Sequence, residues 1–173
     1  MRRLMLLRHA KSDWPDGVDD HERPLARRGQ FASPRVGKYM AEEGLLPDLA
    51  VVSTARRAQE TWELARPAFD ESIVQHNERR IYEATARSIL DVINEADSRT
   101  HALLLVGHNP GLQKLALKLI GTARKSDLAR LQRKFPTAGL VVIDFDVERW
   151  SQVSMARGHL ERFETPKSVD PAY

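Results

Sequence analysis

The 173-residue chain contains no cysteine, and long hydrophobic runs are also missing. The absence of cysteine excludes disulfides, thiolate nucleophiles and thiolate metal sites together. No apolar run approaches the roughly 18 residues of a membrane helix. The apolar stretch that follows Arg3 stops at Arg8, which is too short for a secretory signal peptide. We therefore expect a cytoplasmic protein with no membrane partner, an expectation that depends only on missing signals.

What the chain does contain is an ordinary globular composition with a small excess of positive charge. Hydrophobic residues make up 42% and charged residues 29%, and the formal net charge is +3. A chain of this length fits one domain and buries about 70% of the surface that the unfolded chain exposes. The sequence pI of 9.4 raises the question of a nucleic-acid partner.

Short β-rich runs alternate with longer helical stretches along the chain. This alternation predicts an α/β fold, a three-layer α/β/α arrangement around a mostly parallel sheet, with an antiparallel edge from the last hairpin. The predicted helices cover residues 28–43, closed by Gly44, residues 56–69, a segment capped by Thr85, and a segment from Asn109-Pro110 to near Gly121. The predicted strands are Leu4–Leu7, Leu49–Val52, Ile73–His76, Ala102–Val106, Leu140–Phe145 and Val153–Ala156.

No repeat or linker divides the chain, so we expect a single domain over residues 1–163. The polar stretch Asp13–Arg23 is predicted to be a loop, and Arg124–Lys134 to be basic and exposed. Residues 164–173 lack apolar periodicity, which predicts a flexible tail.

Basic side chains directly follow the three most clearly predicted strands. In an open parallel sheet, ligands bind beyond the carboxyl ends of the strands, so these loops are expected to meet at one edge. Two histidines and at least two arginines would then share a pocket, which favours a bound anion such as a phosphoryl group. The three loops are Arg8-His9-Ala10-Lys11-Ser12, Ser53-Thr54-Ala55-Arg56-Arg57 and Gly107-His108-Asn109-Pro110.

Without cysteine, the covalent acceptor for a phosphoryl group is a serine, an aspartate or a histidine. The sequence has no glycine-rich lysine loop of the kind that holds a nucleotide. A neutral imidazole whose far nitrogen donates to a backbone carbonyl presents its other nitrogen as a nucleophile. His9 and His108 both qualify on this argument.

The ordered set of motifs resembles the histidine phosphatase superfamily, also called the phosphoglycerate mutase-like superfamily. The similarity is greatest to its short bacterial branch of SixA-type phosphohistidine phosphatases. A single Arg-His-Ala would be weak support, whereas the whole set in order is strong. The matching segments are Leu7–Trp14, Arg23-Pro24-Leu25 with Gly29, Ser53–Thr61, Ile81-Tyr82-Glu83-Ala84, Val106–Leu112 and Phe135–Gly139.

The resemblance implies a role for each matched residue. His9 matches the nucleophile that becomes phosphorylated, and Arg8 matches the arginine that binds the phosphoryl group. The family's second arginine follows the serine by four residues, which selects Arg57 over Arg56. His108 matches the second histidine, which donates to a phosphoryl oxygen. For the general acid, Glu78 and Glu83 both remain candidates, because neither has the spacing found in mutase-like members.

The function implied is a phosphatase that needs no metal or other cofactor and acts through a phosphohistidine intermediate, without the large cap of phytase-like relatives. Its partner is a phosphorylated protein or a small phosphorylated metabolite. The leading prediction is a SixA-like phosphohistidine phosphatase, because a protonated imidazole leaves with little help from a general acid. A small-molecule phosphomonoesterase is the alternative, and a non-catalytic phosphate-binding module is the alternative from another class. The oligomeric state stays open.

Several residues also have simpler interpretations. A metal site of His9, His108, Asp13 and His21 is disfavoured, because no compact ligand spacing supports it. His21, His76, His101 and His159 are expected to be ordinary surface or loop histidines. The basic segment 124–134 lacks interleaved aromatic residues, so a solvated helical face is favoured over a nucleic-acid site. Trp14 and Trp62 are expected to be packing residues.

Overall fold

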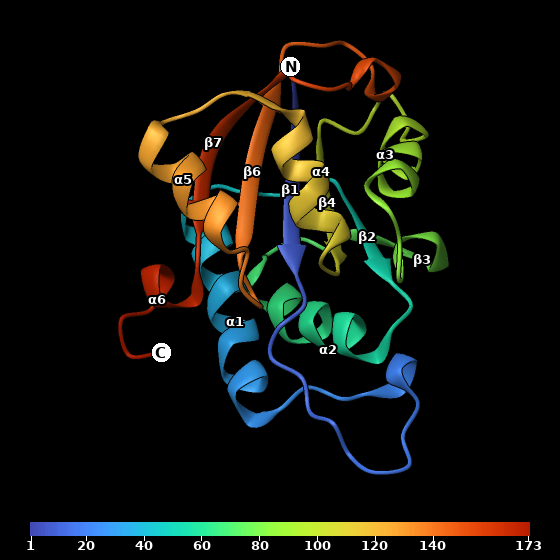
Figure 1. The fold of residues 1–173 in the computed structure, drawn as a ribbon, viewed down its shortest axis with the longest axis vertical. Coiled ribbons are helices and arrows are strands. Elements are labelled where there is room, and N and C mark those ends of the chain that lie inside the picture. The colour runs from blue at the N-terminus through green and yellow to red at the C-terminus, as the bar shows by residue number, and fades with distance from the viewer.

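The computed structural model describes all 173 residues and contains one seven-stranded sheet with six α-helices. The order of the strands in the sheet is β3-β2-β4-β1-β6-β7-β5 (Figure 1). The strands are β1 Arg2–Arg8, β2 Leu49–Ser53, β3 Val74–Glu78, β4 Ala102–Gly107, β5 Ile120–Thr122, β6 Leu140–Phe145 and β7 Gly158–Glu164.

Half of the sheet is parallel and half is mixed. Strands β3, β2, β4 and β1 are parallel neighbours, whereas β6 is antiparallel to both β1 and β7. Leu7 near the end of β1 pairs with Val106 on one side and with Leu140 on the other. Leu140 in turn pairs with Glu164 at the end of β7. The carboxyl ends of the parallel strands, the start of β6 and the end of β7 therefore lie along one edge of the sheet.

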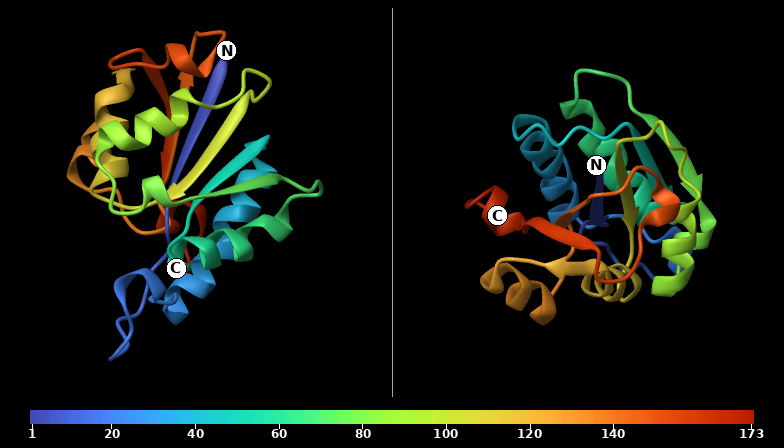
Figure 2. Two further views of the ribbon diagram at one scale, coloured as in Figure 1. Left: turned by 90° about the vertical axis from the view of Figure 1, so that its right-hand side faces the viewer. Right: turned by 90° about the horizontal axis from the view of Figure 1, so that it is seen from above.

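The helices form two layers that cover opposite faces of the sheet, as Figure 2 shows. Because side chains alternate along a strand, Leu4 and Leu6 belong to one core and Met5 and Leu7 to the other. The first core packs against α3, α4 and α5, and the second packs against α1 and α2. The helices are α1 Arg27–Glu42, α2 Arg56–Ala65, α3 Ala86–Asn94, α4 Gly111–Leu119, α5 Lys125–Arg133 and α6 Pro166–Val169. The three-layer fold without a cap domain is confirmed.

Local sequence patterns account for several of the helix ends. Helix α1 ends at Glu42 and is capped by Glu43. The next residue, Gly44, has a φ of 69°, a left-handed conformation that glycine adopts without strain. The Thr85 hydroxyl accepts a hydrogen bond from the Ser88 amide at 3.1 Å and caps α3. The helix predicted from Asn109-Pro110 begins at Gly111, and the Asn109 side chain accepts from the Gln113 amide at 3.2 Å.

The prediction of a strand at Val153–Ala156 is wrong. Trp150–Gln152 form a 3-10 turn, and the last strand begins only at Gly158. The apolar residues of this segment are held in a loop, because the Asn94 side chain donates to the carbonyls of Trp150 and Val153. Val153 is buried without belonging to a strand.

Two predicted helices are shorter in the structure. The helix expected to reach Phe69 ends at Ala65 and continues as a 3-10 turn over Arg66–Ala68, because Pro67 lacks the amide that would continue the α-helical hydrogen bonds. The helix expected to reach Gly121 ends at Leu119, and the next three residues form the unpredicted strand β5. A Cβ at Gly121 would lie 2.1 Å from the Ala156 carbonyl oxygen, so only glycine fits this pairing.

The C-terminal segment carries structure that the sequence did not predict. Residues 166–169 form α6, and Asp170 pairs with Arg35 of α1 at 2.8 Å. The ring of Tyr173 lies 4.7 Å from the guanidinium of Arg28, also on α1. The segment is thus folded against the first helix. None of the helices combines the length and apolar character needed to cross a bilayer.

Candidate active site

The structure brings His9, Arg8, Arg57 and His108 together at the carboxyl edge of the parallel strands. Arg8 ends β1, His9 follows it, His108 follows β4, and Arg57 lies in the first turn of α2. The imidazole centroids of His9 and His108 are 5.1 Å apart. The side chains of both histidines and of Arg57 are buried, with 6% of each residue exposed.

The Nδ1 atom of His9 lies 2.8 Å from the carbonyl oxygen of Ala10. A carbonyl can only accept, so Nδ1 carries the proton and Nε2 keeps a free lone pair. Burial lowers the pKa of His9 to about 3, with Arg57 and Arg8 adding to the effect, while the bond to Ala10 opposes it. The imidazole is therefore neutral at physiological pH, with Nε2 available as a nucleophile.

Hydrogen bonds hold the loop that follows β1, which carries His9 and Ala10, against α2. The Ala10 amide donates to the Thr61 hydroxyl at 2.9 Å, and that hydroxyl donates to the carbonyl of Arg57 at 2.7 Å. On the other side, the Ala138 amide donates to the carbonyls of Arg8 and His9. The backbone around the two basic residues is thus fixed from both sides.

His108 is held by Ser53 at the end of β2. Its Nε2 lies 2.7 Å from the Ser53 hydroxyl, which also accepts from the Ala55 amide. Burial lowers the pKa of His108 to about 3, and the neighbouring His9 and Arg57 add to the effect. Its Nδ1 atom is buried and has no hydrogen-bond partner within the chain.

The arginines also have buried nitrogen atoms without a partner. These atoms are Nε of Arg8 and Nε of Arg57. Arg8 otherwise donates to the Phe135 carbonyl at 3.1 Å. A buried polar atom without a partner costs roughly 1 to 3 kcal/mol, so these two atoms and Nδ1 of His108 favour a ligand with several acceptor oxygens. A phosphoryl group has this chemistry.

Asp20 is the site residue that the sequence did not reveal. It lies in the 13–23 loop, where its carboxylate accepts from Arg57 at 3.1 Å, from Arg23 at 3.0 Å and from the Tyr82 hydroxyl at 2.5 Å. Hydrogen bonds from Tyr82 and the arginines lower the pKa of Asp20 to about 2. Arg57 therefore binds an anion of the chain itself. The same loop contains four other acidic residues, so the sequence pattern gives no reason to select Asp20 among them.

Neither candidate for the general acid hydrogen-bonds to these residues. Glu78 accepts from the Arg80 amide at 2.9 Å and pairs with the Arg80 guanidinium at 2.8 Å. Glu83 is exposed and has a positive φ of 51°. Arg56, the neighbour of Arg57, is exposed and lies 3.6 Å from Glu60.

The other interpretations can also be placed in the structure. No group of three or more His, Asp or Glu side chains is arranged to hold a metal ion. Trp62 is buried in the core beside α2, as a packing residue. Trp14 is exposed and stacks under the guanidinium of Arg23 at 3.4 Å.

Comparison with known proteins agrees with this geometry. Residues 4–84 match the family model described as histidine phosphatase superfamily, branch 1. The putative phosphohistidine phosphatase SixA of Agrobacterium tumefaciens is 31% identical, with 95% of this chain and 98% of that one covered and a TM-score of 0.81. The chain belongs to the histidine phosphatase superfamily.

Two further relatives of this histidine phosphatase extend the similarity. An uncharacterized protein of Mycobacterium tuberculosis is 34% identical over 164 residues, which cover 93% of this chain and all of the relative. The putative SixA of Nakamurella shares the fold at 24% identity and a TM-score of 0.79, over 95% of this chain and 96% of that one. The protein is a phosphatase.

Proposed function

We propose that this histidine phosphatase hydrolyses phosphohistidine in proteins through a phosphorylated His9, without a metal ion. The observation that carries the proposal is the free Nε2 of a buried neutral His9, set beside two arginines and a second histidine with unpartnered nitrogen atoms. This combination supplies a nucleophile and the positive charge that a phosphoryl transfer requires.

In the first step, Nε2 of His9 attacks the phosphorus atom in line with the bond to the leaving group. A bond from Nε2 to phosphorus forms as the bond to the substrate nitrogen breaks, and the electron pair stays on that nitrogen. The other ring nitrogen of the substrate carries a proton taken up from solvent, so a neutral imidazole leaves. Arg8 and Arg57 bind the equatorial oxygens while charge develops on them, and His108 donates to a phosphoryl oxygen. In the second step, water attacks phospho-His9, releases phosphate and returns the imidazole to its starting state.

The choice of a P–N bond follows from the acids available at the site. Asp20 is the carboxylate held by Arg57, and its pKa of about 2 keeps it ionised at neutral pH, so it has no proton to give. An alkoxide leaving group needs a proton from a general acid, whereas a substrate imidazole leaves readily when protonated. A site with an ionised carboxylate suits the second kind of leaving group.

A small-molecule phosphomonoesterase is the alternative that the same superfamily allows. The fold does not separate the two, since mycobacterial glucosyl-3-phosphoglycerate phosphatase shares it at 16% identity and a TM-score of 0.65. The separating measurement is kcat/KM on a panel of phosphohistidine peptides and small phosphate esters. Higher kcat/KM values for esters than for every peptide would contradict the proposal.

The intermediate is tested by rapid quench with a labelled substrate. We expect an acid-labile, alkali-stable phosphoryl label on the wild type and no label on His9→Ala, because a phosphoramidate has this stability profile and His9 is the proposed nucleophile. His108→Ala is the matched control, since it removes the other buried imidazole and leaves the nucleophile in place.

Turnover of an aryl phosphate in the presence of EDTA tests the independence from metal. We expect wild-type activity to be unchanged by the chelator. A label that persists in His9→Ala would show that the nucleophile is another residue, and activity abolished by EDTA and restored by a divalent cation would show a metal requirement.

A further inference from the structure

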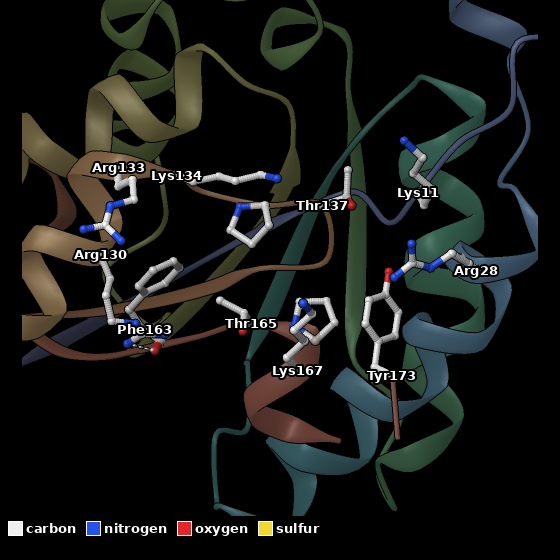
Figure 3. Close-up of a pocket in the computed structure, with 12 residues that line it drawn as sticks. Lys11, Arg28, Arg130, Arg133, Lys134, Thr137, Phe163, Thr165, Lys167 and Tyr173 are labelled. Atoms are coloured by element: carbon white, nitrogen blue, oxygen red, sulfur yellow. Dashed lines mark hydrogen bonds between the residues drawn. The ribbon is translucent and has the colours of Figure 1, made fainter. Parts of the chain in front are cut away.

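A groove of about 500 Å³ lies beside the segment that follows His9, where Lys11 is one of its lining residues (Figure 3). It is lined by the end of α5, the loop before β6, α6, the start of α1 and the segment that follows His9. In Figure 3, Lys11 and Arg28 lie on one side of the groove, and Arg130, Arg133 and Lys134 lie on the other. No acidic side chain lines it.

The cations of this groove are almost all without an ionic partner. Six lysine and arginine side chains line the groove, and only one of them, Arg130, forms a salt bridge, with Asp127 at 3.3 Å. The other five are exposed, and their side chains make neither a salt bridge nor a hydrogen bond within the chain. These five residues are Lys11, Arg28, Arg133, Lys134 and Lys167. Like charges repel across a small groove, so their convergence favours the binding of an anion there.

The groove is continuous with the site through short stretches of backbone. Lys11 lies two residues after His9. Pro136 and Thr137 lie between Phe135, whose carbonyl accepts from Arg8, and Ala138, whose amide donates to the His9 carbonyl. The groove therefore lies next to the backbone that carries Arg8 and His9.

The other side of the site has the opposite charge. The 13–23 loop contacts Arg57, Thr54 and Tyr82, so it lies beside β2, α2 and the turn after β3. The groove lies beside β6 and β7, and the order of the strands places β4 and β1 between these two regions. The loop carries Asp13, Asp16, Asp19, Asp20 and Glu22. The groove is thus basic, whereas the 13–23 loop on the other side of the site carries five acidic residues and one arginine, Arg23.

We propose that the groove binds an acidic segment of the phosphoprotein substrate on one side of its phosphohistidine. This inference depends on the proposed function and specifies its substrate class. A drug-sized ligand is disfavoured, because such pockets have mainly apolar walls, whereas this groove has exposed charged walls. Nucleic acid is disfavoured, because the Tyr173 ring already stacks with Arg28 and because a continuous polyanion would meet the acidic loop.

The test compares three phosphohistidine peptides: one with neutral flanks, one with acidic residues before the histidine and one with acidic residues after it. At low ionic strength, we expect one acidic peptide to exceed the neutral one in kcat/KM by about fivefold or more, since complementary charge raises the association rate. The gain is expected to fall as salt is added. Equal kcat/KM for all three peptides would overturn the proposal.

The variant that tests the groove is Arg28→Gln/Arg133→Gln/Lys134→Gln. We expect it to lose the preference for the acidic peptide and to keep wild-type activity on an aryl phosphate and on the neutral peptide. The matched control is Arg99→Gln/Lys118→Gln/Arg157→Gln, which removes the same charge from exposed residues at the opposite edge of the sheet. An equal loss in the control, or a preference that survives in the groove variant, would overturn the proposal.

A binding measurement separates failure of this proposal from failure of the proposed function. Fluorescence anisotropy of an unphosphorylated acidic peptide reports on the groove even if no phosphohistidine peptide is hydrolysed. We expect the wild type and the control variant to bind this peptide and the groove variant to bind it about tenfold more weakly. No binding to the wild type, or tighter binding of an RNA oligonucleotide of equal charge, would overturn the acidic docking segment.

Discussion

At the scale of single residues, the site depends on which atoms already have partners. The Nδ1 proton of His9 is donated to the Ala10 carbonyl, so the proposed nucleophile is Nε2. Arg57 is held by Asp20, whose carboxylate accepts from the guanidinium as a phosphoryl oxygen would. Part of the positive charge of the site is therefore neutralised within the chain, and in the proposed mechanism an incoming phosphoryl group competes with Asp20 for Arg57.

Asp20→Asn is expected to strengthen inhibition by inorganic phosphate. Removal of a negative charge 3.1 Å from Arg57 lowers the competition for that guanidinium. Because Asp20 is partly exposed, we expect a modest decrease of about threefold to tenfold in the inhibition constant. The matched control is Asp19→Asn, which makes the same change at the exposed neighbouring residue. Equal effects in the two variants would show that only the net charge of the loop matters.

At the scale of elements, close backbone contacts position the loop that carries His9. A Cβ at Gly29 of α1 would lie 2.1 Å from the carbonyl oxygen of Lys11, two residues after His9. A Cβ at Gly37 of the same helix would lie 2.2 Å from the carbonyl oxygen of Ala65 on α2. The first contact places the loop on α1, and the second joins the two helices of one layer.

Gly29→Ala and Gly37→Ala are expected to differ in activity but not in stability. Each forces backbone apart and is expected to lower the free energy of unfolding by about 1 to 3 kcal/mol. Only Gly29→Ala displaces the loop that carries His9, so we expect it alone to lower kcat/KM on an aryl phosphate, by about tenfold or more. The measurement is made at a temperature where both variants are folded. Equal kcat/KM in the two variants would contradict this account.

At the scale of the whole molecule, the fold buries two neutral histidines, His9 and His108, at the carboxyl edge of the parallel strands. Burial lowers the pKa of His9 and of His108 to about 3, from an ordinary value of 6.5. Below pH 6.5 the unfolded chain binds protons that the folded chain does not. Their burial therefore leaves the free energy of unfolding unchanged above about pH 6.5 and lowers it as the pH falls toward 3.

Urea unfolding at pH 7 and pH 5 tests this dependence. The free energy of unfolding of the wild type is expected to fall between these values, with each histidine contributing at most about 1.4 kcal/mol per pH unit. His9→Gln and His108→Gln keep a neutral polar side chain, so each variant is expected to lose less stability over the same interval. The carboxylates titrate in all three proteins and serve as the internal reference. Identical losses in wild type and variants would contradict the proposed titration.

The sequence alone was enough to predict that Arg8, His9, Arg57 and His108 lie at the carboxyl edge of the parallel strands. Each follows an apolar run or opens the helix after one, and the pairing of parallel strands places such positions side by side. The alternation of Leu4, Met5, Leu6 and Leu7 between two cores likewise follows from the period of a strand. Local patterns were sufficient here because regular hydrogen bonding converts spacing in the sequence into position in space.

Only the tertiary structure showed where the loop residues lie and which distant segments meet, because these positions depend on irregular backbone. Asp20 reaches the site through partners 37 and 62 residues away, Arg57 and Tyr82, and no periodicity selects it from the acidic residues of its loop. The same is true of β5, which pairs with the distant β7, and of the cationic groove, whose residues come from both ends of the chain. Loops and long-range charge patterns have no fixed period, so their geometry follows from contacts that form only when the chain is folded.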